Sequence, residues 1–231
     1  MNRRRWALLL LCCTLFASAR GEFAPPPAGG IEANRQALAL FLECAFQPEY
    51  GEESLQPLTR WEKEIAVWAG GQPTKEDLRT LDTFLADLGR KVPGLPAIRR
   101  VPQDLQADIR IWFVPGYMMQ YYVEGYVDGN DGFFHYENPG SKIQMARVAI
   151  ASDLTEQEER NHLILEEMTG ALGLPGDHLK YADSILYDRW TTTQALSDLD
   201  WRMLNLLYSP VVHPGMSRED AKQSLRDWLG V

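Results

Sequence analysis

Apolar and polar positions follow two different periods along this chain, and together they predict a mixed α/β fold. Apolar side chains recur every three or four residues in several segments, which is the spacing of a helix with one buried face. Such helices are predicted at residues 31–46, 74–91, 155–172 and 196–208, and from Ser217 onward. Runs rich in β-branched and aromatic residues predict strands at 60–71, 107–115 and 143–151. The order favours a small twisted mixed sheet packed on a helix, followed by C-terminal helices.

The boundaries of two helices carry capping patterns. Thr74 and Thr155 each stand three residues before an acid, Asp77 and Glu158, which is the spacing of a capping box. We therefore expect both threonines to be N-caps. Between the second and third strands lies a block rich in aromatic residues and glycine (116–140), for which no strand is predicted. Its DGNDG segment lacks the closing glutamate of a calcium loop and is expected to be a hairpin turn.

The N-terminus has the features of a signal peptide. Three arginines precede a short apolar run, and Ala17-Ser18-Ala19 supplies a small-residue cleavage site. The apolar run is too short to span a bilayer comfortably. We therefore expect a signal peptide at residues 1–19, a flexible leader at 20–30 and one domain at 31–231. The chain would be exported, periplasmic or secreted, with no stable membrane anchor.

Charge and cysteine content narrow the range of functions. The formal net charge is −9 and becomes −12 once the three arginines of the signal peptide are removed. A strongly acidic chain is a poor partner for nucleic acid or an acidic membrane surface. Of the three cysteines, only Cys44 lies beyond the signal peptide. No disulfide can then form within the mature chain, and Cys44, in an apolar stretch, is expected to be a buried inert thiol.

The helix at 155–172 carries a candidate site. His162, Glu166 and Gly170 stand four residues apart, on one line opposite its apolar face. Two metal ligands on one helix need this spacing, because it brings both side chains over the same point. The alternative is that His162 and Glu166 form an ordinary surface pair. The spacing leaves both interpretations open.

The end of this helix, LEEMTGALGLPGDH (165–178), resembles the zinc-binding segment of metzincins, whose pattern is H-E-x-x-H-x-x-G-x-x-H. When the glycine of that pattern is aligned with Gly173, the catalytic glutamate falls on Glu167. The three histidine positions fall on Glu166, Gly170 and Gly176. The resemblance implies a zincin-like cleft that keeps the catalytic carboxylate but has none of the standard histidine ligands.

Other segments extend the resemblance. ADIRIWF (107–113) is similar to the metzincin edge strand that pairs with substrate, and DSILYD (183–188) to the Met-turn, with Leu186 in place of Met. EEMTGALGL, SILYD and LYSPVVHPGM resemble a family of exported bacterial proteins of unknown function that is itself metzincin-like. The resemblance covers roughly residues 36–216 and implies a single metzincin-like domain.

Three hypotheses for the function follow. In the first, the protein lacks the standard zinc site and binds an extended peptide in the remaining cleft beside ADIRIWF, lined by aromatic side chains (Tyr117, Tyr121, Tyr122 and Tyr126). In the second, it is a zinc peptidase with rearranged ligands, His162, Glu166 and either His178 or Asp177, and with Glu167 as general base. In the third, it is a structural domain of the cell envelope without activity.

Overall fold

The computed structural model describes residues 30–47 and 56–231, so the predicted signal peptide and all but the last residue of the predicted leader lie outside the described residues. The helices are α1 (Ile31–Cys44), α2 (Lys75–Lys91), α3 (Gln157–Ala171), α4 (Asp198–Leu207) and α5 (Arg218–Leu229). The strands are β1 (Arg60–Trp61), β2 (Ile65–Gly71), β3 (Ile98–Arg100), β4 (Ile109–Val114), β5 (Gly132–Glu137), β6 (Lys142–Ile143) and β7 (Met145–Ala151). Three short 3₁₀ helices, η1 (Asp104–Gln106), η2 (Gly116–Tyr121) and η3 (Pro139–Ser141), lie in the connections.

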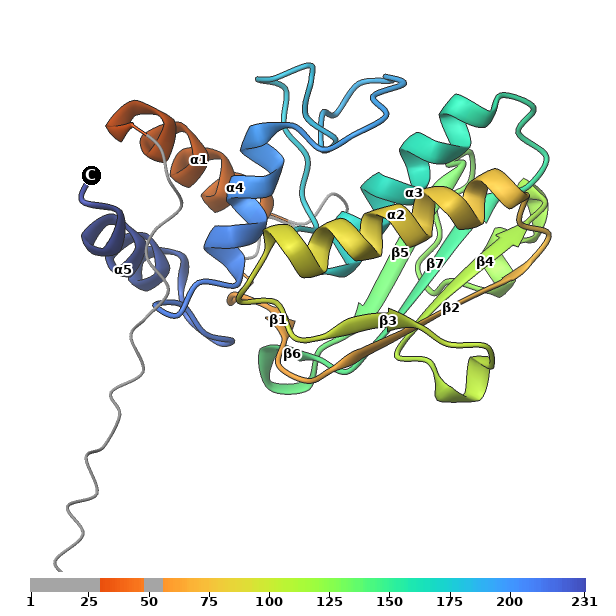
Figure 1. The fold of residues 1–231 in the computed structure, drawn as a ribbon, viewed down its shortest axis with the longest axis horizontal. Coiled ribbons are helices and arrows are strands. Elements are labelled where there is room, and N and C mark those ends of the chain that lie inside the picture. The colour runs from red at the N-terminus through yellow and green to blue at the C-terminus, as the bar shows by residue number, and fades with distance from the viewer. Residues whose placement is uncertain (1–29, 48–55) are drawn as a thin grey trace, which may run out of the picture.

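A five-stranded sheet forms one half of the molecule, with strand order β3-β2-β4-β7-β5. The first four strands are parallel, and β5 runs antiparallel to β7. The helices α2 and α3 lie over one face of the sheet, while α1, α4 and α5 gather at the other end of the molecule (Figure 1). A separate two-stranded sheet pairs β1 with β6. The predicted mixed α/β fold, with a mixed sheet on the candidate-site helix and C-terminal helices, is confirmed.

The edge of the sheet is not where the sequence predicted it. β4, which contains most of ADIRIWF, is paired on both sides, with β2 and with β7. Its buried run of Ile109, Ile111 and Phe113 suits a central strand of a parallel sheet, which is covered by its neighbours. The edge strands are β3 and β5, and β5 lies inside the aromatic block where no strand was predicted. The DGNDG segment ends at the first residue of β5 and lies in the connection between β4 and β5, which do not pair with each other, so the hairpin-turn prediction was also wrong.

Strand alternation sends the aromatic residues to opposite faces of the sheet. Phe134 of β5 points toward α3, whereas its neighbour Phe133 lies on the other face, where its ring is 5.7 Å from that of Tyr126. On that same face Tyr122 stacks 4.8 Å from Trp112. Tyr122 and Tyr126, two of the four tyrosines expected to line a cleft beside ADIRIWF, therefore lie on the face of the sheet opposite α3.

Two observations complete the fold. Cys44 is fully buried, as expected, and burial raises the pKa of its thiol well above the usual value. No helix in residues 30–47 or 56–231 is both long and apolar enough to cross a membrane.

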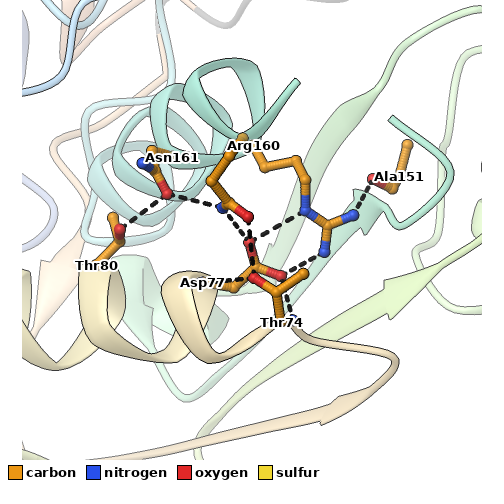
Figure 2. Close-up of polar contacts among 7 residues, drawn as sticks. Thr74, Asp77, Thr80, Ala151, Arg160 and Asn161 are labelled. Carbon is orange, nitrogen blue, oxygen red and sulfur yellow. Dashed lines mark hydrogen bonds and ion pairs between the residues drawn. The ribbon is translucent and has the colours of Figure 1, made fainter. Parts of the chain in front are cut away.

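A buried ion pair joins the two helices that cover the sheet. Thr74 caps α2 through the predicted capping box with Asp77. Asp77 also accepts hydrogen bonds from Arg160 and Gln157 in the first turns of α3, and Arg160 donates to the Ala151 carbonyl at the end of β7, at 3.2 Å (Figure 2). These contacts fix α2, α3 and β7 to one another.

The start of α3 differs from the prediction in one respect. Its N-cap is Glu156, which makes no side-chain capping hydrogen bond, so the predicted Thr155 cap was wrong. The Thr155 hydroxyl donates instead to the Glu156 carboxylate, at 3.3 Å. The first turn of α3 is held by tertiary contacts rather than by a local cap: Gln157 donates to Asp77 at 2.7 Å and Arg160 completes the ion pair.

Breaking this pair is expected to destabilise the protein strongly. Asp77→Ala leaves the Arg160 guanidinium buried without its partner, a change that costs about 3–5 kcal/mol in comparable buried pairs. The free energy of unfolding, measured by urea titration, should fall accordingly. The control is Arg79→Ala, which removes an exposed ion pair with Glu76 on the same helix and should change stability by less than about 0.5 kcal/mol. Equal losses in the two variants would contradict this account.

The same pair predicts a dependence of stability on pH. Burial by itself would raise the pKa of Asp77, but hydrogen bonds from Arg160, Gln157 and Thr74 outweigh it, and the pKa lies below its ordinary value of 3.8. The stabilisation by ionised Asp77 is therefore complete above pH 3.8 and is lost as the pH falls through the lowered pKa. In Asp77→Asn, unfolding free energy should fall less steeply below that pH than in the wild type.

Candidate functional site

A cleft opens where α3 approaches the edge strand β5, and two glycines allow this approach. A Cβ on Gly132 of β5 would lie 2.4 Å from Glu167 Oε1 and 2.8 Å from Leu163 Cδ2. A Cβ on Gly170 of α3 would lie 2.3 Å from the ring of Phe134. Both distances are far below a normal contact, so neither position tolerates a side chain without movement. Gly170 aligns with a histidine of the metzincin pattern, and the Phe134 ring occupies the space that a side chain at this position would take.

Two cavities that share part of their lining form this cleft, which we call the α3 cleft. The larger, about 320 Å³, is lined by Asn130, Asp131, Leu154, Glu159, His162, Leu163, Glu166, Asp177 and residues 187–191. The smaller, about 160 Å³, adds Gly132, Phe134, Glu167, Gly170, Leu174, Pro175 and Leu186 to the shared Asn130, Asp131, Leu163, Glu166 and Asp177. The lining of the two cavities contains six carboxylates and two groups that can carry positive charge, His162 and Arg189, so the cleft is acidic.

His162 and Glu166 lie side by side in the cleft, as their spacing predicted. The His162 ring donates from Nδ1 to the Thr193 carbonyl at 3.0 Å, and its Nε2 faces Glu166 Oε2 at 3.4 Å. Burial lowers the pKa of His162, but the Glu166 carboxylate and the Thr193 carbonyl both favour the protonated ring, and the net effect raises the pKa. The hydrogen bond from His162 to Thr193 therefore joins α3 to the loop that forms one wall of the cleft.

His178 takes part in a different network. The Lys180 backbone N–H donates to its Nδ1 at 3.1 Å, so Nε2 carries the proton and donates to Ser184 Oγ at 3.0 Å. Ser184 in turn donates to Asp200 Oδ1 at 2.5 Å. All three side chains are buried, and burial lowers the pKa of His178. Both ring nitrogens serve to hold the 178–188 loop against the start of α4.

The three residues predicted as metal ligands are thus not gathered at one point. Asp177, rather than its neighbour His178, lines the cleft together with His162 and Glu166. In the described ranges 30–47 and 56–231, no group of three or more His, Cys, Asp or Glu side chains is arranged to hold a metal ion. Glu167, predicted as the general base, is 8% exposed and lines the smaller cavity.

The residues at the metzincin ligand positions have packing roles. Gly170 is in contact with Phe134, as described above. A Cβ on Gly176 would lie 2.1 Å from the Gln47 carbonyl oxygen, and its N–H donates to the Cys44 carbonyl at the end of α1 at 2.9 Å. Glu166 supplies the single carboxylate among the three positions and faces His162. These residues do not fit a three-ligand zinc site.

The outer edge of β5 borders the cleft and was missed by the sequence analysis. The backbone N–H of Ala151 donates to the Asp131 carbonyl, and that of Gln144 donates to the Glu137 carbonyl. The backbone N–H and C=O groups of the odd-numbered residues in this segment therefore face β7. In an antiparallel pair the intervening residues face the other way. The N–H and C=O groups of Gly132, Phe134 and Tyr136 therefore point to the outer edge. The signal in the sequence was the run of aromatic residues in GFFHYE after a turn.

Comparisons with known proteins give a family and two similar structures. A family model described as "Protein of unknown function (DUF2927)" matches residues 34–227. Two solved structures of myroilysin are similar: one has a TM-score of 0.44 at 12% identity and covers 66% of this chain and 82% of its own. The other has a TM-score of 0.44 at 11% identity and covers 80% and 99%. At this level the two structures carry no argument about function. No curated protein matches this chain.

The contact between Gly170 and Phe134 yields a stability prediction. Gly170→Ala should lower the free energy of unfolding by about 1–3 kcal/mol, because the added methyl group overpacks against the ring. Combining it with Phe134→Leu should cost less than the sum of the two single changes, since the smaller side chain makes room. The control is Gly89→Ala in α2, where an added Cβ meets nothing within 4 Å. That change should stabilise the helix by about 1 kcal/mol, and a loss there would argue against the packing explanation.

Proposed function

We propose a function for this chain, which belongs to the DUF2927 family of proteins of unknown function, from the geometry of its site. In this proposal the protein is exported and binds an extended peptide against the outer edge of β5. In this proposal the standard zinc site of the metzincin pattern is lost and the cleft is kept for binding. Export rests on the N-terminal sequence, which lies outside the described residues. The observation that carries the proposal is the edge strand itself, which borders the α3 cleft.

The backbone groups of β5 supply the affinity. An edge strand presents unpaired N–H and C=O groups, and an extended peptide can pair with them as an added strand. The outward-facing groups of Gly132, Phe134 and Tyr136 would receive such a peptide. Every second side chain of the peptide would then turn toward α3 and enter the cleft, because side chains alternate along a strand. Selectivity would come from those side chains alone.

The charge of the cleft favours a basic side chain in the peptide. Asp131, Asp177 and Glu166 line both cavities, and Glu167, also on α3, lines the smaller one. Burial raises the pKa of Asp131, and the nearby charge of Asp153 adds to the effect. A lysine or arginine of the peptide would offset this repulsion among carboxylates. The proposed ligand is accordingly an extended peptide with lysine or arginine at alternate positions.

Two arrangements support the loss of the standard zinc site. Phe134 occupies the space beside Gly170, and Gly176 packs on the backbone at the end of α1. The rearranged zinc peptidase, with His162, Glu166, either His178 or Asp177, and the base Glu167, receives no such support. Both nitrogens of His178 are bonded within its own loop. Although Asp177 lines the cleft, no group of three or more His, Cys, Asp or Glu side chains in residues 30–47 and 56–231 is arranged to hold a metal ion. The purely structural alternative gives no reason for an acidic cleft beside an edge strand.

Binding by strand addition can be tested with the peptide rather than the protein. An array of decapeptides, half with lysine and half with glutamate at alternate positions, should bind the purified protein only in the lysine set. N-methylation of one set of alternate backbone amides in the best binder should abolish binding, and methylation of the other set should leave it unchanged, because only one set faces β5. Equal effects of the two sets would rule out strand pairing.

Metal content separates this proposal from the zinc peptidase. After exposure to zinc and removal of the excess, untagged protein should retain well under one zinc per chain by mass spectrometry. His162→Ala should give the same count, since the proposal assigns His162 to the contact with Thr193. One zinc per chain that is lost in His162→Ala would replace the binding protein with the rearranged peptidase.

A further inference from the structure

A basic groove lies between α1 and α5, at the end of the molecule away from the five-stranded sheet (Figure 1). Its volume is about 640 Å³, within the range of about 300–1,000 Å³ typical of small-molecule sites. Five basic side chains line it: Arg35, Lys180, Arg218, Lys222 and Arg226. The whole chain has 23 basic and 32 acidic residues. The groove therefore concentrates positive charge on an acidic protein.

Three of these charges form a stripe along α5. Arg218, Lys222 and Arg226 are spaced four residues apart, so their side chains lie on one face of the helix, which is turned to the groove. Like charges at this spacing destabilise a helix. Glu219 contacts Arg218 at 3.3 Å and Lys222 at 3.4 Å in exposed pairs. Arg218 Nε also donates to the Leu42 carbonyl at 3.3 Å, and Arg226 Nε to the Val231 carbonyl at 3.1 Å. These partners balance the positive charge of the stripe only in part, so the stripe favours an anion.

The opposite wall of the groove is provided by α1. Among the residues the structure describes, Arg35 makes no hydrogen bond or ion pair, and it stands on the same wall as Leu38, Ala39 and Leu42. Glu43, on the same helix, is bonded to Lys180. The groove thus combines basic side chains with an apolar floor formed by Leu38, Ala39 and Leu42, and an amphiphilic anion needs both features.

We propose that this groove binds the monomer of a single-chain anionic amphiphile, such as an alkyl phosphate. Its headgroup would lie along Arg218 and Lys222, and its chain over Leu38, Ala39 and Leu42. Arginine and lysine both form charge-assisted hydrogen bonds to phosphate oxygens. An inorganic anion would leave the apolar floor uncovered. A bilayer of anionic lipid would be repelled by the acidic remainder of the protein, so the ligand is a monomer rather than a membrane surface.

The test uses dodecyl phosphate below its critical micelle concentration, titrated into the purified full chain by calorimetry. Saturable binding with one ligand per chain is expected. The double variant Arg218→Gln/Lys222→Gln should weaken it by about tenfold or more, because it removes charge-assisted hydrogen bonds. The matched control is Arg99→Gln/Arg147→Gln, which removes the same charge from exposed positions on the sheet and should bind like the wild type.

A second variant tests the apolar floor. Ala39→Gln keeps the charge and changes an exposed position, so the protein should fold, with an unchanged melting temperature, but bind dodecyl phosphate more weakly. Equal affinity for inorganic phosphate would reduce the groove to a simple anion site and overturn the proposal. So would equal weakening in the control double variant, binding to anionic vesicles without binding of the monomer, or no binding by the wild type.

Discussion

The buried pair of Asp77 and Arg160 sets the framework on which the rest of the structure depends. Removing two charges from water is costly, and the structure offsets this cost by bonding the remaining polar atoms, with Thr74 and Gln157 on one side and the Ala151 carbonyl on the other. One ion pair thus connects the start of α2, the first turn of α3 and the end of β7 (Figure 2). Since α3 provides the floor of the acidic cleft, the position of that cleft relative to the sheet depends on this contact.

Close packing of α3 on β5 is the second constraint, and it shapes the α3 cleft. Gly132 and Gly170 bring the helix and the edge strand together, and Phe134 fills the space between them. The loop after α3 is fixed by a buried chain of hydrogen bonds from His178 to Ser184 and from Ser184 to Asp200. Gly170 and Gly176, which align with two histidines of the metzincin pattern, pack closely on Phe134 and on the backbone at the end of α1.

The two proposed ligand sites have opposite charge and share one loop, in which Asp177 lines the α3 cleft and Lys180 lines the basic groove. The α3 cleft is acidic and borders the edge of the sheet, whereas the groove between α1 and α5 is basic and lies among the helices. Fields of opposite sign select ligands of opposite charge and orient them as they approach. A basic peptide and an anionic amphiphile would therefore not compete for one site.

Sequence patterns by themselves determined the helices, the fold class and the adjacency of His162 and Glu166, because helical periodicity, the Thr74 cap and four-residue spacing are local properties. They could not decide which strand lies at the edge, since strand order depends on pairing between distant segments, and β4 was misplaced for that reason. Nor could they show that Phe134 occupies the space beside Gly170, or that His178 bonds to Ser184. Those contacts join residues through space, and only the tertiary structure decides them.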